Sequence, residues 1–111
     1  MTEFHRGDIV VMALQGEHGK PRPALIVQAD VFAATGRYAV LPITSGLVDA
    51  PLLRVDIDAN SETGLKQQSQ AALSRITTAD RKRIDRVIGK LSDAQMLEIS
   101  GKLAVFLGIA A

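Results

Sequence analysis

A single arginine, Arg22, lies between two prolines at the start of a strongly apolar run. Pro21 restricts the chain before it, and Pro23 drives Arg22 itself towards extended geometry, so the guanidinium is presented with little backbone freedom. Such a guanidinium can bind a phosphate or a carboxylate through two parallel hydrogen bonds. An ordinary surface arginine paired with an acidic side chain is the alternative, and the spacing alone does not decide between them.

Two groups that can exchange protons precede Arg22 in the same loop. Glu17 lies five residues before Arg22, with His18 next to it, and a histidine titrates near neutral pH unless its surroundings perturb it. Transesterification of RNA needs such a group beside a phosphate-binding arginine, because the 2′-hydroxyl must lose a proton and the leaving 5′-oxygen must gain one. A solvated loop without a chemical role is the alternative.

Hydroxyl and amide side chains stand at the ends of two predicted strands. Thr44 and Ser45 end one of them and can bond phosphate oxygens, or they can simply satisfy a turn backbone. Ser69 and Gln70 open a later strand and could line the same cleft, with ordinary edge polarity as the alternative.

The composition excludes several classes of function. The 111 residues predict a single domain over 1–111, and 47% hydrophobic residues suffice for a core. Cysteine is absent and only two histidines occur, so neither a metal site nor a cofactor is expected. No signal peptide or membrane-spanning run is recognisable, which favours a cytoplasmic protein.

The net charge is +1, but basic residues gather in one segment: Arg75, Arg81, Lys82, Arg83, Arg86 and Lys90. This segment either attracts RNA or forms a solvated face.

The elements that must position these residues are mostly strands. Strands are predicted over 8–14, 24–28, 37–43, 52–57 and 70–76, and residues 83–91 fit either a strand or a short helix. The apolar run from Ala24 shows no alternation, so both of its faces are expected to be covered.

Ser92 and Gln95 form a capping-box pattern that begins a helix ending at Gly108. Gly101 in that helix is expected to allow close approach to a neighbour. The pattern predicts a small antiparallel barrel or strongly bent sheet with a C-terminal helix, whose exposed edges make pairing into a dimer plausible.

Taken together, the motifs resemble those of the MazF/PemK family of toxin endoribonucleases. The blocks "RGDIV", "GKPRPALIV", "LPITS", "TGL…SQ" and "RITTADRKRI…IGKLS" follow one another in the order typical of this family. The resemblance extends from Arg6 to about Leu107. The Arg-Pro-Ala-Leu-Ile-Val block is fairly specific because the strand before it and the Thr-Ser turn after it accompany it.

The resemblance implies a fold, an activity and partners. The fold would be an SH3-like barrel of antiparallel strands with a C-terminal helix, assembled as a homodimer. The activity would be metal-independent, sequence-specific cleavage of single-stranded RNA that leaves a 2′,3′-cyclic phosphate and a 5′-hydroxyl, inhibiting translation and growth. The partner, besides RNA, would be a small antitoxin whose disordered C-terminal tail folds across the RNA groove.

The resemblance also assigns roles by position. The family's catalytic arginine falls on Arg22, its strand-end hydroxyl on Thr44, and its loop glutamate on Glu17. Family members often have glutamine where this chain has His18, and many have an acid at the position of Ser69, so Glu17 or His18 is the candidate base. Candidate RNA contacts are Lys20, Ser45, Ser69, Gln70, Arg81 and Arg83.

Two other functions compete with this interpretation. A gyrase poison of the CcdB type would share the fold without cutting RNA, but such proteins lack the Arg-Pro block and depend on a C-terminal tail with tryptophan, whereas this chain has no tryptophan. A non-catalytic SH3-like module would need an aromatic-lined groove, and the aromatic residues here are few and scattered.

Overall fold

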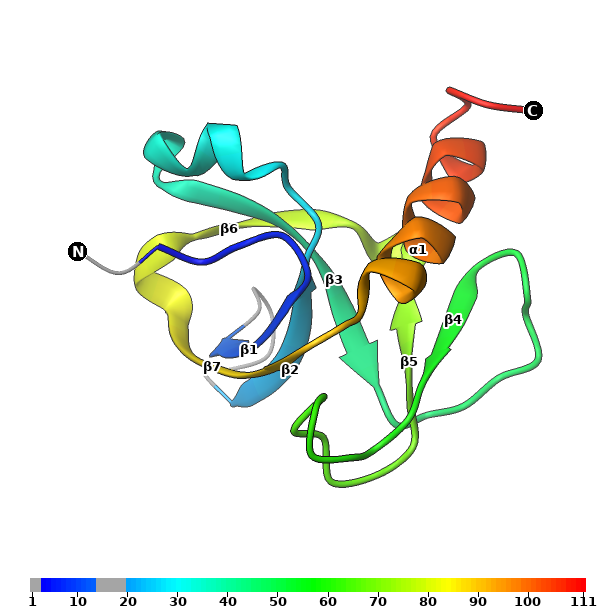
Figure 1. Cartoon of the computed structure of the whole chain (residues 1–111), viewed down its shortest axis with the longest axis horizontal. Helices are drawn as coiled ribbons and strands as arrows, with labels where there is room; N and C mark the ends of the chain where they lie inside the picture. Colours follow the sequence, from blue (N-terminus) through cyan, green and yellow to red (C-terminus); the bar gives the residue numbers. More distant parts are fainter. Residues whose placement is uncertain (1–2, 14–19) are drawn as a thin grey trace.

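The computed structural model describes residues 3–13 and 20–111, which form an antiparallel sheet with one helix (Figure 1). The strands are β1 (Asp8–Ala13), β2 (Pro21–Ile26), β3 (Arg37–Thr44), β4 (Arg54–Ile57), β5 (Ser69–Ala72), β6 (Thr77–Asp80) and β7 (Ile84–Lys90). The helix is α1 (Asp93–Phe106), and three 3₁₀ turns are η1 (Asp30–Thr35), η2 (Leu73–Arg75) and η3 (Arg81–Arg83). The strands are hydrogen-bonded in the order β4-β5-β3-β2-β1-β7, and β6 pairs with β3.

The sheet bends at β3, because the two halves of this strand pair with different neighbours. Its first half, from Arg37 to Val40, pairs with β6, whereas Ile43 and Thr44 pair with β5. The opposite edge of β3 pairs with β2. Since β4 and β7 end the strand order, the described sheet is strongly bent but is not a closed barrel. The prediction of a mainly antiparallel fold with a C-terminal helix is confirmed.

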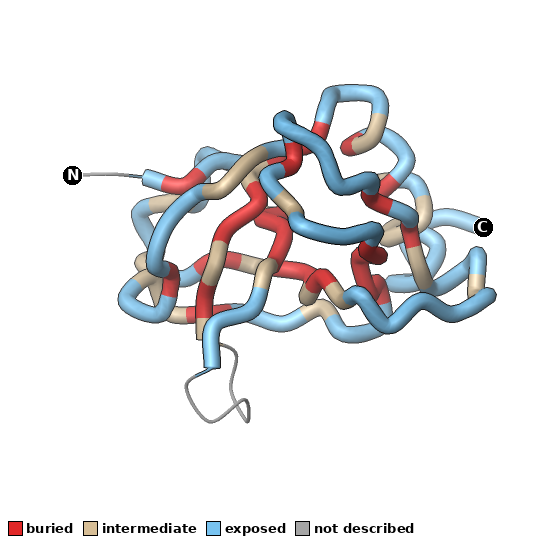
Figure 2. The backbone as a smooth tube through the Cα atoms, turned by 90° about the horizontal axis from the view of Figure 1, so that it is seen from below, coloured by how far each residue is buried: buried red, intermediate tan, exposed pale blue. Residues whose placement is uncertain are grey.

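The central strands bury both of their faces. Buried residues are the red segments of the backbone in Figure 2. On one face, Ile9, Leu25, Leu41 and Ile43 pack with Met96 and Ile99 of α1. On the other face, Val10, Met12, Ala24, Ile26, Tyr38 and Val40 pack with Ala79 and Ile84. Alternate side chains of a strand point to opposite faces, so two cores require a strand that is apolar throughout. This confirms the interpretation of the run from Ala24.

The helix α1 begins as the sequence predicts and packs less completely than expected. The Ser92 hydroxyl accepts a hydrogen bond from the Gln95 backbone at 3.2 Å, and the Gln95 side chain accepts one from the Ser92 backbone at 2.8 Å. Phe106, the last residue of α1, is exposed. The expectation for Gly101 is wrong within the described chain, where no atom outside its own helix backbone lies within 4 Å of a Cβ built there.

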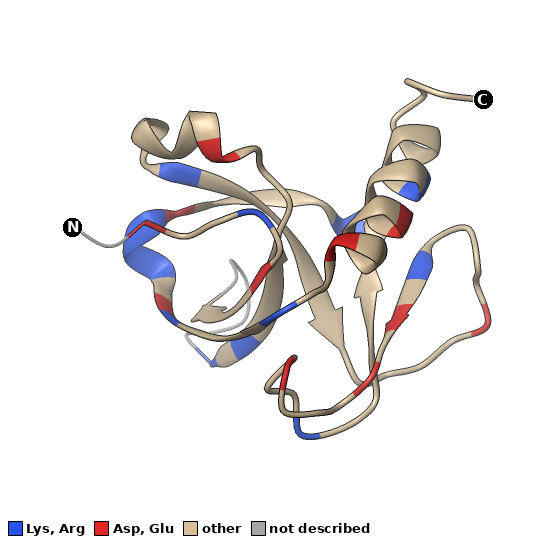
Figure 3. Cartoon of the chain, viewed as in Figure 1, with Lys and Arg blue, Asp and Glu red and all other residues tan. Residues whose placement is uncertain are grey.

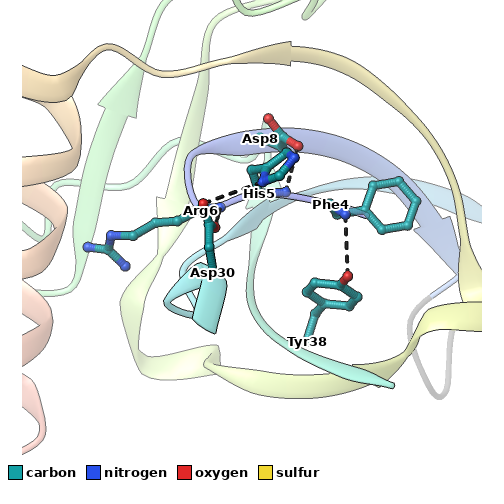
Figure 4. Close-up of polar contacts among 6 residues, drawn as sticks. All are labelled: Phe4, His5, Arg6, Asp8, Asp30 and Tyr38. Atoms are coloured by element: carbon teal, nitrogen blue, oxygen red, sulfur yellow. Dashed lines mark hydrogen bonds and ion pairs between the residues drawn. The ribbon is translucent and has the colours of Figure 1, made fainter. Parts of the chain in front are cut away.

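Two carboxylates fix the segment that leads into β1 (Figure 4). Asp8 accepts a hydrogen bond from the backbone N–H of His5 at 2.8 Å, and Asp30 accepts one from the backbone N–H of Arg6 at 2.7 Å. The His5 ring lies 3.4 Å from Asp30. The hydrogen bond from the Arg6 backbone, assisted by the His5 side chain, lowers the pKa of Asp30 below its ordinary value.

The same segment links the two cores. The Arg6 guanidinium donates to the carbonyl of Val27 and to the hydroxyl of Ser100 on α1. Phe4 inserts into the second core, where its ring packs edge-on to that of Tyr38 with centroids 5.7 Å apart (Figure 4). The "RGDIV" block therefore has a structural role: it anchors the start of β1 to β2 and to the helix.

The loop that follows β4 lies tightly against β7. The Thr63 hydroxyl is buried and donates to the carbonyl of Asp58 at 2.8 Å. The N–H of Lys90 donates to the carbonyl of Glu62 at 2.9 Å. A Cβ added at Gly89 would lie 2.3 Å from the backbone of Thr63. Glycine is therefore required at this position for the loop to reach the strand.

The element boundaries differ from the prediction in several places. β2 begins at Pro21 and includes both prolines, β4 begins at Arg54, and β5 ends at Ala72, immediately before η2. The ambiguous segment 83–91 is mainly the strand β7, and β6 was not predicted. β6 is short and polar at Thr77 and Thr78, so it carries little of the hydrophobic pattern on which strand prediction depends.

Candidate active site

Arg22 is held in the extended geometry that its neighbouring prolines predict. It is the second residue of β2, and it is exposed. Its Cα partner across the ladder is Met12 of β1, which is 1% exposed. Directly opposed residues of an antiparallel pair project to the same face, so Arg22 stands on the face of the second core, next to a buried side chain.

Thr44 ends β3 on the same face. The ladder between β2 and β3 ends at the pair Ala24 and Pro42. The same register continued by two residues leads to Arg22 on β2 and to Thr44 on β3. Because side chains alternate along each strand, both residues project from the face that carries Pro42. The register extended in this way directs Arg22 and Thr44 to one face, just beyond the end of the paired part of β2 and β3.

The Thr44 hydroxyl organises the turn after β3. Its Oγ1 accepts a hydrogen bond from the backbone N–H of Gly46 at 3.0 Å. Ser45, between them, is exposed. A hydroxyl that accepts from the backbone keeps its own proton to donate, which suits contact with a phosphate oxygen.

Gln70 is buried behind this turn, and its amide is fully engaged. It is 6% exposed and is the Cα partner of Thr44. Its Oε1 accepts from the N–H of Val48 at 3.1 Å and from Nη1 of Arg54 at 3.0 Å, and its Nε2 donates to the carbonyl of Val48 at 3.1 Å and to Oδ1 of Asp56 at 2.9 Å. Two acceptor and two donor positions are the whole capacity of a primary amide. Gln70 thus clamps the loop that follows Thr44.

Arg54 is a member of this network that the sequence analysis missed. Besides Gln70, its Nη1 contacts the carbonyl of Gly46 at 3.0 Å. The signal in the sequence was the alternation of β4, where Val55 and Ile57 are buried while Arg54 and Asp56 lie on the polar face. This pattern placed Arg54 on the polar face but did not indicate which loop it would bond.

Ser69 lies beside Gln70 but is occupied locally. It is 4% exposed, and its hydroxyl donates to the carbonyl of Gln67 at 2.8 Å. Lys20, adjacent to β2, is exposed. The candidate acid and base, Glu17 and His18, lie outside the described residues, so their positions relative to Arg22 stay a prediction.

The basic segment is divided between two environments (Figure 3). The Arg81 guanidinium lies over the Phe4 ring, 5.9 Å from its centroid. Arg83, from the same turn η3, lines a groove together with Lys82 and Arg75. The sequence analysis grouped Arg81 with Arg83, but only Arg83 borders this groove.

Two further classes of feature were sought in the described ranges 3–13 and 20–111. No group of three or more His, Asp or Glu side chains is arranged there to hold a metal ion. Nor does any helix in these ranges have the length and apolar character needed to cross a membrane.

Solved structures of toxins share this architecture. The Mycobacterium tuberculosis toxin MazF-mt6 superposes with a TM-score of 0.79 at 23% identity, over 94% of this chain and 99% of that one. An endoribonuclease in complex with its cognate antitoxin from a mycobacterial species superposes with a TM-score of 0.75 at 20% identity, over 100% and 99% of the two chains. A MazE-MazF structure from Deinococcus radiodurans gives 0.75 at 20% identity, over 99% and 100%. The fold is that of MazF toxins.

The sequence identifies the family. Residues 5–107 match the family of PemK-like, MazF-like toxins of type II toxin-antitoxin systems. A probable endoribonuclease MazF of Mycolicibacterium smegmatis is 42% identical over 108 residues, which cover 96% of this chain and 99% of the relative. The chain belongs to the PemK/MazF toxin family. The prediction of a MazF-type toxin endoribonuclease is confirmed at this level, and the gyrase-poison alternative is not favoured.

Proposed function

We propose that this toxin cleaves single-stranded RNA without a metal ion, by attack of a 2′-hydroxyl on the adjacent phosphate. The observation that carries the proposal is the common face of Arg22 and Thr44 at the end of the β2–β3 pair. Membership of a toxin family with an endoribonuclease relative supports the substrate class. We further propose that residues 1–111 act as one toxin domain in the cytoplasm, where messenger RNA, the proposed substrate, is found.

In the proposed reaction, Arg22 and Thr44 hold the phosphate that is cut. The 2′-oxygen loses its proton and bonds to phosphorus, and the bond from phosphorus to the 5′-oxygen breaks. The products are a 2′,3′-cyclic phosphate and a 5′-hydroxyl, whose oxygen takes up a proton. The guanidinium and the threonine hydroxyl donate to the non-bridging oxygens as negative charge builds there. Ser45, next to Thr44, adds a further hydroxyl for the same strand of RNA.

Glu17 and His18 are the proposed proton carriers. They precede Arg22 by a few residues in the sequence, and Ser69 cannot act as a carboxylate base. A carboxylate and an imidazole can share the two proton transfers, one as base and the other as acid. Replacing each in turn by Gln should remove one limb of the pH profile of kcat/KM. Retention of both limbs in both variants would exclude the pair.

The decisive experiment compares RNA cleavage by the parent with cleavage by Arg22→Ala and Thr44→Val, with EDTA present. Loss of one preorganised donor costs on the order of 10²–10³ in rate, so both variants should be nearly inactive. Arg86→Ala is the matched control, because Arg86 is exposed on β7 and pairs with its neighbour Asp85 at 2.5 Å. Products should carry 5′-hydroxyl ends that accept labelled phosphate directly. A folded Arg22→Ala variant that cuts at the parent rate would refute the assignment.

We propose two protein partners. The first is a small antitoxin with a disordered C-terminal tail that covers the RNA-binding face, supported by the antitoxin complexes of structural relatives. Lys20 and Arg83 would contact both RNA and this tail.

The second proposed partner is another copy of the chain. Leu97 and Val105 form an exposed apolar stripe on the outer face of α1, at 75% and 48% exposure, and a homodimer would cover it.

A further inference from the structure

A basic groove of about 730 Å³ lies beside the proposed cleavage site. Four cationic residues and two threonines line it: Arg37, Arg75, Lys82, Arg83, Thr77 and Thr78. Among the residues that the structure describes, the only carboxylate in the lining is that of Asp80, which accepts a hydrogen bond from the N–H of Lys82 at 2.9 Å. The described lining therefore carries four positive charges and one negative charge, a net of +3, although the net charge of the whole chain is only +1.

The groove adjoins the proposed catalytic pair. Met12, which lies opposite Arg22, and Pro42, which precedes Thr44 on the same face, both border it. From Pro42 the groove extends along β3 and β6 to the pair formed by Arg37 and Asp80. Pro42 lies five positions along the strand from Arg37. At about 3.4 Å per residue, this is a distance of roughly 17 Å. More than one nucleotide fits along that length.

The chemistry of the lining suits a sugar–phosphate backbone and not bases. Guanidinium, ammonium and hydroxyl groups bond phosphate and ribose oxygens. Arg37 donates to the hydroxyl of Thr78 at 3.2 Å, and the residue is exposed. None of the described residues that line the groove is aromatic, so they offer no platform on which a base could stack. Tyr38, which follows Arg37 in the sequence, is buried in the core.

We propose that this groove binds the backbone of the RNA on one side of the cut phosphate, independently of its sequence. The proposal rests on the proposed function, since the groove serves the same RNA strand that Arg22 and Thr44 hold. It assigns Arg75 and Arg83 to substrate positioning rather than to chemistry. It also predicts that nucleotides in the groove add affinity without adding to the recognised sequence.

The test compares a short RNA, limited to the mapped cut site, with RNAs extended on either the 5′ or the 3′ side. Extension on one side should raise kcat/KM of the parent about tenfold, whatever the added sequence. In the double variant Arg75→Gln with Arg83→Gln, the ratio of long to short substrate should fall to about one. The matched control, Lys66→Gln with Arg86→Gln, removes the same charge outside the groove and should keep the parent ratio.

A binding measurement separates failure of this proposal from failure of the proposed function. Fluorescence anisotropy with labelled RNAs carrying a 2′-deoxy residue at the cut site reports affinity without cleavage. Each lost phosphate contact lowers the salt dependence of single-strand binding by about 0.7 in log–log slope, so the groove variant should lose roughly 1.4 and the control less. Equal slopes, a parent without any length advantage, or a strong preference among added sequences would each overturn the proposal.

Discussion

Replacing Gln70 with leucine isolates the clamp behind Thr44. Leucine has nearly the same volume, so the change removes hydrogen bonds without opening a cavity. The four bonds lost connect Gln70 to both backbone groups of Val48, to Arg54 and to Asp56. The contacts of Gly46 with Arg54 and with Thr44 remain, as do the backbone hydrogen bonds to the carbonyl of Ala50.

The expected loss of stability follows from how exposed the partners are. A hydrogen bond contributes about 0.5–1.5 kcal/mol net. Val48 is 47% exposed and Asp56 is also exposed, so water can replace part of what they lose, and the lower end of that range applies. Four bonds then amount to about 2 kcal/mol. For a domain of this size, each kcal/mol moves Tm by about 4 °C, which gives a decrease of about 8 °C.

The effect on activity should exceed the effect on stability. If the clamp positions Thr44, a small displacement of its hydroxyl lowers kcat by about tenfold or more while the protein stays folded. Thermal unfolding and RNA cleavage at a temperature well below both Tm values measure the two effects separately. Gln68→Leu is the control, since Gln68 is exposed. Unchanged kcat in a destabilised Gln70→Leu variant would reject the positioning argument, and an unchanged Tm would reject the clamp itself.

Three further changes test other parts of the structure. Gly89→Ala should destabilise the chain by about 3 kcal/mol in urea unfolding, because the new Cβ would overlap the Thr63 backbone. The control Gly101→Ala should not destabilise it. Equal effects of the two changes would show that the loop around Thr63 moves to make room for the new Cβ. Asp30→Ala should destabilise the protein at neutral pH. Because the folded-state pKa of Asp30 lies below its ordinary value of 3.8, the difference from the parent should shrink as pH falls below 3.8, and a constant difference in unfolding free energy would contradict the cause assigned. Leu97→Glu should halve the mass measured by light scattering if α1 forms the dimer interface, and an intact dimer would place that interface elsewhere.

The sequence predicted the strands that carry a clear hydrophobic pattern and missed β6, which carries little of one. The run from Ala24 to Val27 is buried on both faces. A strand that is buried on both faces has apolar residues at successive positions rather than at alternate ones. β6 has only Ala79 buried, so its place in the sheet depends on pairing with β3 rather than on any pattern of its own. The capping box of α1 was predictable because both of its hydrogen bonds are local.

The candidate site was predictable to the extent that local chemistry determines it. The prolines around Arg22 fix its backbone wherever the strand lies, and Thr44 ends a strand whose apolar pattern is unmistakable. Gln70 was predicted as a residue facing the cleft, but its hydrogen bonds come from residues 14 to 22 positions away in the sequence. No local pattern encodes such contacts. For the same reason the sequence did not separate the surroundings of Arg81 from those of Arg83. The Arg81 guanidinium lies over the ring of Phe4, which is far away in the sequence.

The relative position of Arg22 and Thr44 is fixed by the core rather than by contacts at the site. Ile26 and Val40 are paired across the ladder, and both are fully buried. A slip of one residue between β2 and β3 would turn an entire set of core side chains towards solvent, so the register can change only if the sheet unfolds. That register determines which β3 residue lies opposite Arg22. The loops and the basic groove can therefore change, while the two residues that we propose to hold the phosphate keep their relative position.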